Sequence, residues 1–528
     1  MSMSAQAAAK TGSGLSYDEV PYESFAYPQT HPAHVSTIAT LFGLTPPDFR
    51  TASVLELGCA SGGNLLPLAL LYPQASFLGI DLSSEQISQA ALRKKDLHLG
   101  NIEFLQQDIL EFAPQDKQKK FDYIICHGIF SWVPETVREK IFTLCNEFLS
   151  PQGVAIISYN ALPGWNAVRS LREMMLYHTS RFAKPEEKIQ QARSLLDFLA
   201  ENVPEGNTGY RAVIEDERKL LKNINNSYLY HDHLEGVNTQ FYLHDFARMA
   251  KLHGLDYVGD TNIAAMYVGN MPPKAMETLK VLHDVVSQEQ YMDFITNRRF
   301  RSSILCKGGQ KINRNLKNEQ IMNYFLTANP ATEVTGSDPK QDIVFKVGRG
   351  NFTTHEAVSG TLFLELRACG AKPVAAGELV ERVQKKLGLP DAKPVRDVLV
   401  AQGLQLVLRG YLNISSDSPH YVTEVGKKPV AFPLARYEAG MNNCRTVTNV
   451  LSSTLPSDLL ANLILKNLDG SRTAQDVADI LVESVLKGIL KMEKSGAPVK
   501  DETEIRRDML KVVAEVLPRL AKHGLLVG

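Results

Sequence analysis

The spacing of apolar residues changes character twice along the chain. Between residues 53 and 160, short apolar runs alternate with longer amphipathic stretches, which is typical of strands and helices around a parallel sheet. The runs predict strands at Ser53–Leu57, Ser76–Ile80, Ile102–Gln106, Phe121–Cys126 and Val154–Ser158. The stretches between them predict helices at Asn64–Leu71, Ser84–Leu97 and Pro134–Leu149, with Ser83 as the N-cap of the second. We therefore expect an α/β, doubly wound sheet with a ligand crevice at the carboxyl ends of its strands.

Beyond Pro163 and Gly164 the apolar spacing becomes purely helical. It predicts helices at Val168–His178, Ala183–Asn202 and Tyr210–Asn223. A helix at Leu243–His253 and strands at Leu255–Val258 and Arg299–Cys306 would then complete a seven-stranded sheet. We therefore assign residues 1–165 and 238–307 to one ligand-binding domain. Residues 166–237 form a helical insertion, which we expect to serve regulation or dimerisation.

The remaining chain shows a faint internal repeat. Asn329–Asp342 carries two prolines, a glycine and polar residues, and we expect residues 308–342 to be a linker. Two sets of three helical stretches follow, one ending at Gly410 and the other at Gly524, each before an apolar pair. Three helices followed by a short strand resemble winged-helix modules. We expect two mainly helical, winged-helix-like modules, at residues 343–420 and 421–528.

Composition and charge narrow the class of protein. The chain has 57 Lys plus Arg against 58 Asp plus Glu, so no global positive field favours nucleic acid as a partner. No apolar run reaches the 20 or so residues that span a bilayer. The six cysteines contain no CxxC pair, and we expect them to be reduced in a cytoplasmic protein. Residues 1–14 have neither the basic start nor the apolar core of a signal peptide.

Small and acidic residues cluster where the first predicted strand meets the first predicted helix. The segment from Glu56 to Asn64 contains three glycines, which let a backbone approach a ligand closely, and a helix start offers unpaired N–H groups. Asp81 ends the second predicted strand, 23 positions after Gly58. A carboxylate there can accept hydrogen bonds from two ribose hydroxyls. These features predict a nucleoside-binding edge.

Two cofactors use such an edge. A nicotinamide dinucleotide would need Gly58, Ala60 and Gly63 as its fingerprint, with Ala60 in place of the second glycine, which is a strained alternative. S-adenosyl-L-methionine carries no phosphate, and its cationic sulfonium is suited by the negative potential of Glu56. Asp108 adds an acceptor for an adenine amino group, and Ile109 can cover the ring. These residues together favour the sulfonium cofactor.

These motifs resemble those of class I S-adenosylmethionine-dependent methyltransferases, which have a Rossmann-like sheet. A narrower resemblance rests on Tyr17–Tyr22, Pro28–Pro32, Gly128–Pro134, Ser158–Trp165 and Asn297–Arg301. It is to methyltransferases that carry a regulatory domain, including the rickettsial lysine methyltransferases that act on outer-membrane proteins. Ala60 departs from the glycine usual in the superfamily. The resemblance implies lysine N-methylation of a protein, such as the outer-membrane proteins on which the rickettsial enzymes act. It also implies S-adenosyl-L-homocysteine as the product of the cofactor.

Site residues follow from the motifs and the resemblance. The cofactor candidates are Gln29, Thr30, Glu56, Gly58, Cys59, Ala60, Gly62, Asn64, Asp81, Leu82, Gln86, Asp108, Ile109 and His127. Methyl transfer is an in-line displacement that needs a neutral amine aligned with the sulfonium and shielded from water. The candidates for binding and activating that amine, in a lid before the first strand or at the crevice rim, are Tyr17, Tyr22, His31, Ser131, Trp132, Tyr159, Asn160 and Trp165.

Some alternatives stay open at this point. The extra modules could only form a homodimer around a small-molecule N- or O-methyltransferase, or the pocket could serve a non-catalytic sensor. His231 and His233 have a metal-like spacing, but no third ligand is evident, so we expect a solvated or hydrogen-bonded pair and no metal site. We expect the Arg298, Arg299 and Arg301 cluster to form a charged strand edge or a subunit contact.

Overall fold

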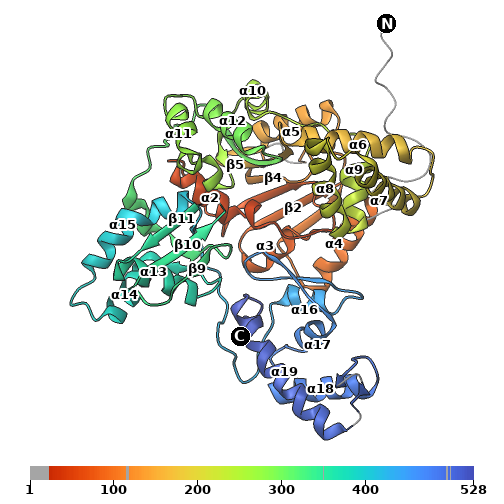
Figure 1. The fold of residues 1–528 in the computed structure, drawn as a ribbon, viewed down its shortest axis with the longest axis vertical. Helices are drawn as coiled ribbons and strands as arrows, with labels where there is room; N and C mark the ends of the chain where they lie inside the picture. Colours follow the sequence, from red (N-terminus) through yellow and green to blue (C-terminus); the bar gives the residue numbers. More distant parts are fainter. Residues whose placement is uncertain (1–22, 115–117, 340, 349, 495–496, 500) are drawn as a thin grey trace.

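A seven-stranded sheet forms the centre of the largest part of the molecule (Figure 1). The computed structural model describes residues 23–114, 118–339, 341–348, 350–494, 497–499 and 501–528. The strands are β1 (Ser53–Leu57), β2 (Ser76–Asp81), β3 (Ile102–Gln106), β4 (Phe121–Cys126), β5 (Leu149–Asn160), β6 (Leu255–Asp260) and β7 (Phe300–Lys307). Their order is β3-β2-β1-β4-β5-β7-β6, and β7 runs antiparallel to both neighbours. This confirms the predicted Rossmann-like sheet, with the strand order reversing between β1 and β4.

Helices cover both faces of the sheet. The helices of this domain are α2 (Pro32–Leu41), α3 (Leu65–Leu71), α4 (Ser84–Asp96), α5 (Glu135–Phe148), α10 (Leu243–Leu252), α11 (Pro273–Leu279) and α12 (Val285–Thr296). Alternate residues of each strand enter two separate cores: Val54 packs with α2 and α3, whereas Leu55 packs with α5 and α10. Ser83 caps α4 as predicted, since its Oγ accepts a hydrogen bond from the Gln86 N–H at 3.2 Å.

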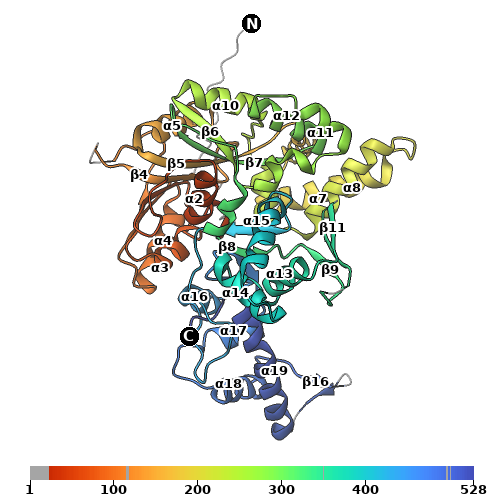
Figure 2. The same cartoon turned by 90° about the vertical axis from the view of Figure 1, so that its left-hand side faces the viewer.

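The helical insertion contains one helix more than the sequence pattern predicts. It consists of α6 (Trp165–Thr179), α7 (Pro185–Asn202), α8 (Thr208–Asn223) and α9 (Asn226–Leu234). These helices share a separate small core, with Leu171, Leu196 and Ile214 among its members. The short helix α9 escaped prediction because tyrosines and histidines interrupt its apolar spacing. Figure 2 shows the insertion projecting from the side of the sheet.

Two of the three arginines that we expected at a charged strand edge or subunit contact, Arg298 and Arg301, instead belong to an ion-pair network, whereas Arg299 is exposed. Arg301 is fully buried, and its guanidinium donates to Asp293 at 2.7 Å and to Glu289 at 3.0 Å. Arg298 pairs with Asp260 at 2.8 Å. The sequence pattern missed this network because α12, which carries Asp293 and Glu289, was not predicted.

Residues 308–342 are not a linker. They contain the 3-10 helix η4 (Asn318–Asn323) and the strands β8 (Phe325–Ala328) and β9 (Glu333–Thr335). β8 is the central strand of a small sheet with the order β12-β8-β13. Its partners are β12 (Val374–Ala375) and β13 (Leu412–Ser415), far away in sequence. No local hairpin signal therefore marks β8, and its proline- and glycine-rich neighbours resemble a loop.

The rest of the middle module completes the first copy of the repeat. It adds β10 (Ile343–Val347), β11 (Gly350–Thr354), α13 (Ala357–Ala368), α14 (Ala376–Leu387) and α15 (Lys393–Leu408). The chain runs from the central strand β8 through α13 to the edge strand β12, then through α14 and α15 to the other edge strand β13. Gly410, with φ +81°, turns the chain from α15 into β13.

The C-terminal module follows the same path. Its elements are α16 (Pro433–Ala439), β14 (Thr446–Thr448), β15 (Thr454–Pro456), α17 (Leu459–Leu465), α18 (Ala474–Leu486), β16 (Glu493–Lys494), β17 (Ala497–Pro498) and α19 (Glu502–Lys522). Val430 and Ala431 occupy the place of β8, since they bridge to Asp469 on one side and Leu526 on the other. Gly524, with φ +70°, turns α19 into the last bridge. The internal repeat predicted from the sequence is therefore present in the fold.

Both modules pack on the domain that contains the large sheet. The Tyr72 hydroxyl donates to Asp417 at 2.6 Å, and Arg50 pairs with the same carboxylate at 2.8 Å. The hydrophobic core around α2 and α3 continues without a break into the middle module. Leu66 of α3 is buried in the core of the C-terminal module, and Leu70, Leu71, Leu97, Leu99 and Phe104 of the large domain pack against the same core.

Candidate functional site

The loop between β1 and α3 has an unusual backbone. Gly58 and Gly62 have φ +74° and φ +79°, and Ala60 between them has φ +46°. A Cβ at Gly58 would lie 2.3 Å from Cδ1 of Ile129. The loop is tied to β2, because the N–H groups of Gly58 and Cys59 both donate to the carbonyl of Ile80. The sequence therefore needs glycine at position 58 for both conformation and space.

Asp81 fixes the same loop from the end of β2. Its Oδ2 accepts from the Ala60 N–H at 2.9 Å, and its Oδ1 accepts from the Ser83 N–H at 3.0 Å. These two bonds tie both the loop and the start of α4 to the end of β2. Its place at the carboxyl edge suits the hydroxyls of a ribose.

Glu56 lies under the loop in a buried polar network. Its Oε1 accepts from Asn64 Nδ2 at 2.7 Å, and the side chain is only 4% exposed. Burial raises the pKa of Glu56 to about 8, and the nearby Asp81 carboxylate adds to this rise. Within the part of the chain that the structure describes, Oε2 of Glu56 has no hydrogen-bond partner. A buried carboxyl group with one oxygen that accepts no hydrogen bond is suited to bind a cationic group of a ligand.

A segment before the first strand covers this network. Asn64 Oδ1 accepts from the Tyr27 N–H at 3.0 Å, and Asn64 Nδ2 donates to Thr30 Oγ1 at 3.0 Å. The Ser24 hydroxyl accepts from the Gly63 N–H at 2.8 Å. Residues 23–30 therefore lie on the glycine loop. The predicted lid residues Tyr17 and Tyr22 fall outside the described residues, and Gln29 is half-buried in the 3-10 helix η1 (Pro28–Thr30).

Aromatic rings line the edge where β4 ends and β7 begins. The Tyr27 and His127 ring centroids lie 4.3 Å apart, and the Phe300 ring lies edge-on to His127 at 5.9 Å. Burial lowers the pKa of His127 to about 4, so this imidazole is neutral at pH 7. Among the described residues, its Nδ1 contacts no hydrogen-bond partner.

The rim residues after β4 and β5 are held together by side-chain bonds. The Ser131 hydroxyl accepts from the Asn160 N–H at 2.9 Å, and Asn160 Nδ2 donates to Asn238 Oδ1 at 3.2 Å. Trp132 and Trp165 meet edge to face with centroids 6.2 Å apart. The structure thus brings four of the residues predicted at the rim together, and adds Asn238 to them.

Two predicted acceptor-site residues lie elsewhere. Tyr159 is 1% exposed and stacks on Phe246 at 4.2 Å in the core below the rim. His31 caps α2, since its Nδ1 accepts from the Ala33 N–H at 3.1 Å, and burial lowers its pKa to about 4. Its other nitrogen faces Tyr72 and the middle module. Both residues therefore have structural roles in this fold.

The remaining cofactor candidates follow β2 and β3 or line the loop. Asp108 Oδ1 accepts from the Leu110 N–H at 2.8 Å, and Ile109 is half-buried beside it. Leu82 is 47% exposed, an apolar surface available to a ring. Gln86 is buried at the start of α4. Cys59 is buried, and burial raises its thiol pKa well above the usual value, so it serves packing rather than chemistry.

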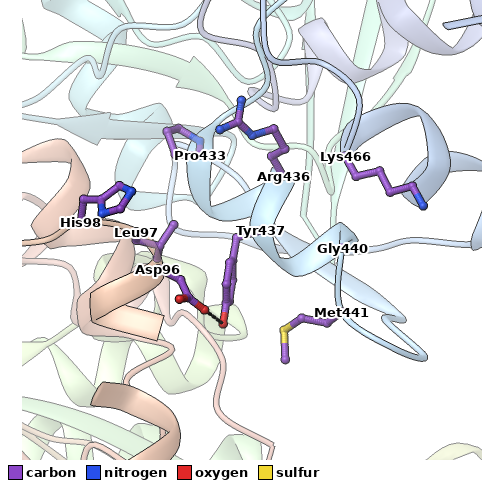
Figure 3. A pocket seen from close by; sticks show the side chains of 9 residues that line it. All are labelled: Asp96, Leu97, His98, Pro433, Arg436, Tyr437, Gly440, Met441 and Lys466. Carbon is purple, nitrogen blue, oxygen red and sulfur yellow. Dashed lines mark hydrogen bonds between the residues drawn. The ribbon is translucent and has the colours of Figure 1, made fainter. Parts of the chain in front are cut away.

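A large cleft lies at the opposite edge of the sheet (Figure 3). It has a volume of about 680 Å³ and separates the end of α4 from α16 and α17. Its cationic residues Arg436 and Lys466 lie at the ends of helices, where positive charge complements the helix dipole. Because α4 ends at the amino edge of the strands, this cleft lies between the large domain and the C-terminal module. It is not part of the nucleoside-binding edge.

Neither a metal site nor a membrane span is found among the described residues. His233 Nε2 bonds to Glu217 at 2.9 Å and His231 Nδ1 to Glu235 at 3.2 Å, so the pair is hydrogen-bonded as predicted but buried rather than solvated. No group of three or more potential metal ligands occurs in the described ranges. In the same ranges, every helix is too short or too polar to cross a bilayer.

Models of known protein families match residues 49–307 and 427–525 of the chain. A methyltransferase domain model matches residues 49–224, and a predicted methyltransferase regulatory domain matches residues 225–307. The PKMT C-terminal winged helix domain matches residues 427–525. The match to the regulatory domain begins at α9 and includes β6 and β7. It therefore shares only the last helix, α9, with the helical insertion.

Individual relatives are similar over their full length. An uncharacterized protein of Rickettsia prowazekii is 39% identical over 519 residues, which cover 97% of this chain and 93% of the relative. The structure of PKMT2 from Rickettsia typhi in complex with AdoHcy is 34% identical, with a TM-score of 0.87 over 96% of this chain and 100% of that one. Fold, loop and relatives together define a class I methyltransferase that uses S-adenosyl-L-methionine. The chain belongs to the PKMT family, the protein lysine methyltransferases that include PKMT2 of Rickettsia typhi.

Proposed function

We propose that this chain transfers a methyl group from S-adenosyl-L-methionine to the side-chain amine of lysines in a protein. The observation that carries the proposal is the buried Glu56–Asn64 network under a loop that Asp81 fixes, because it matches a cationic nucleoside ligand. Membership of the PKMT family supports lysine as the acceptor.

Different residues of the chain would bind different parts of the donor molecule. Asp81 would accept from the ribose hydroxyls, and Asp108 with Ile109 would bind the adenine. Glu56, with its vacant Oε2, and the loop N–H groups would hold the methionyl end. When bound, the donor supplies an electrophilic methyl group on a positively charged sulfur. Residues 23–30 cover the loop and keep water from this region.

The rim offers a site for the acceptor. Its aromatic rings and amides suit the long apolar stem and the amine of a lysine. His127 is neutral at pH 7, so it adds no positive charge that would repel the amine or the sulfonium. Ser131 and Asn160 hold the rim backbone in place.

We further propose that the acceptor is an outer-membrane protein that is methylated in the cytoplasm before export. The resemblance to the rickettsial enzymes supports this acceptor class. All six cysteines are free thiols in the structure, which is compatible with a reducing compartment.

We also propose that the chain forms a homodimer through the helical insertion. Tyr177 is 82% exposed on α6 and Phe198 is 59% exposed on α7, and large apolar side chains on a surface favour association. Light scattering of the purified protein should give twice the mass of the chain. The double change Tyr177→Lys and Phe198→Lys should give the monomer mass.

Mass spectrometry of a cell lysate tests the main proposal. The purified protein is incubated with the lysate and a donor that carries an isotopically labelled methyl group. We expect the label on lysines of one or a few proteins, and outer-membrane proteins among them. Label found only on metabolites would replace the proposal with small-molecule methylation. Donor binding without any transfer would indicate a non-catalytic sensor.

A further inference from the structure

The middle module holds the helix that follows the covering segment, residues 23–30. Ser416 lies directly after β13, and its N–H donates to the Thr37 hydroxyl of α2 at 2.8 Å. The Ser416 hydroxyl donates to the carbonyl oxygen of Ala33, in the first turn of the same helix, at 3.1 Å. The module therefore contacts α2 at the end nearest to the covering segment.

The next residue, Asp417, carries a buried carboxylate that joins the middle module to α3. Its Oδ2 accepts from the Tyr72 hydroxyl at 2.6 Å, and its Oδ1 pairs with Arg50 at 2.8 Å. Asp417 is 7% exposed, and Tyr72 is the C-cap of α3. Burial and the neighbouring carboxylate raise the pKa of the Tyr72 hydroxyl well above its usual value, so this hydroxyl keeps its proton and donates.

His31 lies between Tyr72 and the covering segment. Burial lowers the pKa of His31 to about 4, so its imidazole is neutral at pH 7 and carries one N–H. Nδ1 accepts from the Ala33 N–H, which places that hydrogen on Nε2. Nε2 lies 3.4 Å from the Tyr72 hydroxyl oxygen, and the two rings meet edge to face at 5.7 Å. His31 therefore donates to Tyr72, and Tyr72 donates to Asp417.

The peptide that precedes His31 reaches the proposed donor site. Thr30 Oγ1 accepts from Asn64 Nδ2 at 3.0 Å, and the Tyr27 N–H donates to Asn64 Oδ1 at 3.0 Å. Asn64 Nδ2 also donates to Glu56 at 2.7 Å. A series of side-chain contacts and one peptide bond thus connects the middle module with the carboxyl group under the glycine loop.

We propose that Asp417, Tyr72 and His31 act together as positioning residues that hold the covering segment over the donor. This inference rests on the part of the proposed function that places the donor at the glycine loop, and it is independent of the methyl acceptor. It gives the middle module a role in the exchange of product for donor.

Loss of one contact in this series should favour an open position of the covering segment. A hydrogen bond to a charged group corresponds to about a tenfold or larger change in an equilibrium constant. A ligand under a closed segment leaves only after the segment opens. The dissociation rate of the ligand should therefore rise by about the same factor as the open population.

Tyr72→Phe tests the series at its centre, because it removes the hydroxyl and leaves the Arg50–Asp417 ion pair. We expect bound, isotopically labelled S-adenosyl-L-homocysteine to dissociate about tenfold faster than from the wild type when unlabelled ligand is added in excess. Asp417→Ala should give at least the same rise. In both variants, hydrogen–deuterium exchange of the covering segment in the ligand-free protein should also be faster. Neither measurement depends on methyl transfer.

Tyr257→Phe is the matched control. The Tyr257 hydroxyl donates to the buried Glu289 at 2.8 Å, and Glu289 keeps Arg301 as its partner at 3.0 Å. The change therefore removes the same kind of hydrogen bond, from a tyrosine to a carboxylate that is paired with an arginine. It should lower the melting temperature as Tyr72→Phe does. It should leave the dissociation rate and the exchange of the covering segment unchanged.

His31→Asn separates the two roles of His31. Asparagine is a good N-cap, so α2 should still begin at Pro32, but its shorter side chain lacks the second ring nitrogen that reaches Tyr72. We expect the same rise in dissociation rate as in Tyr72→Phe. The double variant should dissociate no faster than either single variant, because both changes break the same series.

The contrary outcomes point to different conclusions. A wild-type dissociation rate in Tyr72→Phe or Asp417→Ala, an equal rise in Tyr257→Phe, or a multiplied effect in the double variant would overturn the role of this series. Each of these outcomes leaves methyl transfer to lysine intact. Faster dissociation in Tyr72→Phe together with no methylation of any protein would overturn the proposed acceptor and support this inference. A wild type that binds no S-adenosyl-L-homocysteine would overturn both.

Discussion

The cofactor side and the acceptor side of the site are built in different ways. The cofactor side comes from one continuous loop, residues 56–64, and the ends of the two next strands. The acceptor side combines residues 23–30, the end of β4, the helix α9 and the start of β7. The first is encoded locally, whereas the second exists only when segments about 200 positions apart come together, as in the Asn225–Glu23 bond. A local motif reveals the cofactor, and only the assembled fold reveals where the acceptor binds.

The two sides also use carboxylates differently. On the cofactor side, Asp81 accepts backbone N–H bonds and Glu56 is buried with a pKa of about 8. On α9, burial raises the pKa of Asp232 only to about 6, so this carboxylate is ionised at pH 7 whereas Glu56 is mostly protonated. Changes at Glu56 and Asp81 should therefore alter donor binding.

Gly58→Ala should have the largest effect on the cofactor side. A non-glycine residue at φ +74° costs about 1–2 kcal/mol, and overpacking against Ile129 adds about 1–3 kcal/mol. We expect a loss of about 2–5 kcal/mol in the free energy of unfolding, measured by denaturant titration. Gly388→Ala is the control, since Gly388 has φ +63° and open space around it. Equal losses in both variants would show that crowding at Ile129 has no effect.

Asp81→Ala should come next. It removes the acceptor of the Ala60 N–H and the proposed acceptor of the ribose hydroxyls, and a hydrogen bond to a charged group contributes about 1.5–3 kcal/mol. We expect cofactor affinity to fall roughly 10-fold or more, measured by calorimetry. Glu103→Ala, at an exposed position of β3, should leave the affinity unchanged. Unchanged cofactor affinity in Asp81→Ala would show that Asp81 does not contribute to cofactor binding.

Glu56 should link donor binding to pH. Its raised pKa of about 8 keeps most molecules protonated at pH 7, and a cationic donor favours the ionised form, so binding should release up to one proton. Affinity should rise with pH until about pH 8. Calorimetry in two buffers with different ionisation enthalpies counts the protons. The count should drop to near zero in Glu56→Gln, and an unchanged count would place the proton elsewhere.

The same shift predicts a pH dependence of folding. Because the folded-state pKa of Glu56 is raised, its favourable contribution is complete below the ordinary carboxyl pKa and is lost as pH rises toward about 8. Thermal unfolding of the wild type and of Glu56→Gln should therefore differ more at pH 8 than at pH 5, with the wild type the less stable of the two at pH 8.

Ala60→Gly should have the smallest effect and the opposite sign. Ala60 has φ +46°, and relief of this strain exceeds the entropy that glycine adds to the unfolded chain by about 0.5–1 kcal/mol. We therefore expect the free energy of unfolding of Ala60→Gly to exceed that of the wild type by this amount. Ala212→Gly, at an exposed position of α8, should lose about 1 kcal/mol instead. A loss at both positions would mean that Ala60 is not strained.

The sequence predicted the local parts of the molecule well. The sheet strands lie within a few residues of their predicted positions, and Ser83 caps α4, because strand spacing and capping are short-range signals. Tyr159 was predicted at the rim, after the end of its strand, whereas β5 runs on to Asn160 and Tyr159 lies in the core. Both faces of β5 are buried, so the alternation that would orient a half-exposed strand is missing.

The parts that escaped prediction depend on distant partners. β8 pairs with strands far along the chain, and Arg301 is neutralised by acids on the unpredicted helix α12. The helix α9, which Asn225 joins to the segment over the glycine loop, has a mixed polar and aromatic sequence with no clear helical period. Only tertiary contacts give these residues their roles.

The contact between Ser24 and Gly63 has a consequence for turnover. A methyl group at Gly63 would lie 2.4 Å from the Ser24 carbonyl oxygen, so the covering segment and the loop touch without intervening space. In the proposed site, product must leave before fresh donor can enter, and residues 23–30 cover the loop that would hold both. The rate at which product is exchanged for donor therefore depends on how fast residues 23–30 move away from the loop. Single-turnover and steady-state rates of methyl transfer should differ, because only the steady-state rate includes this movement.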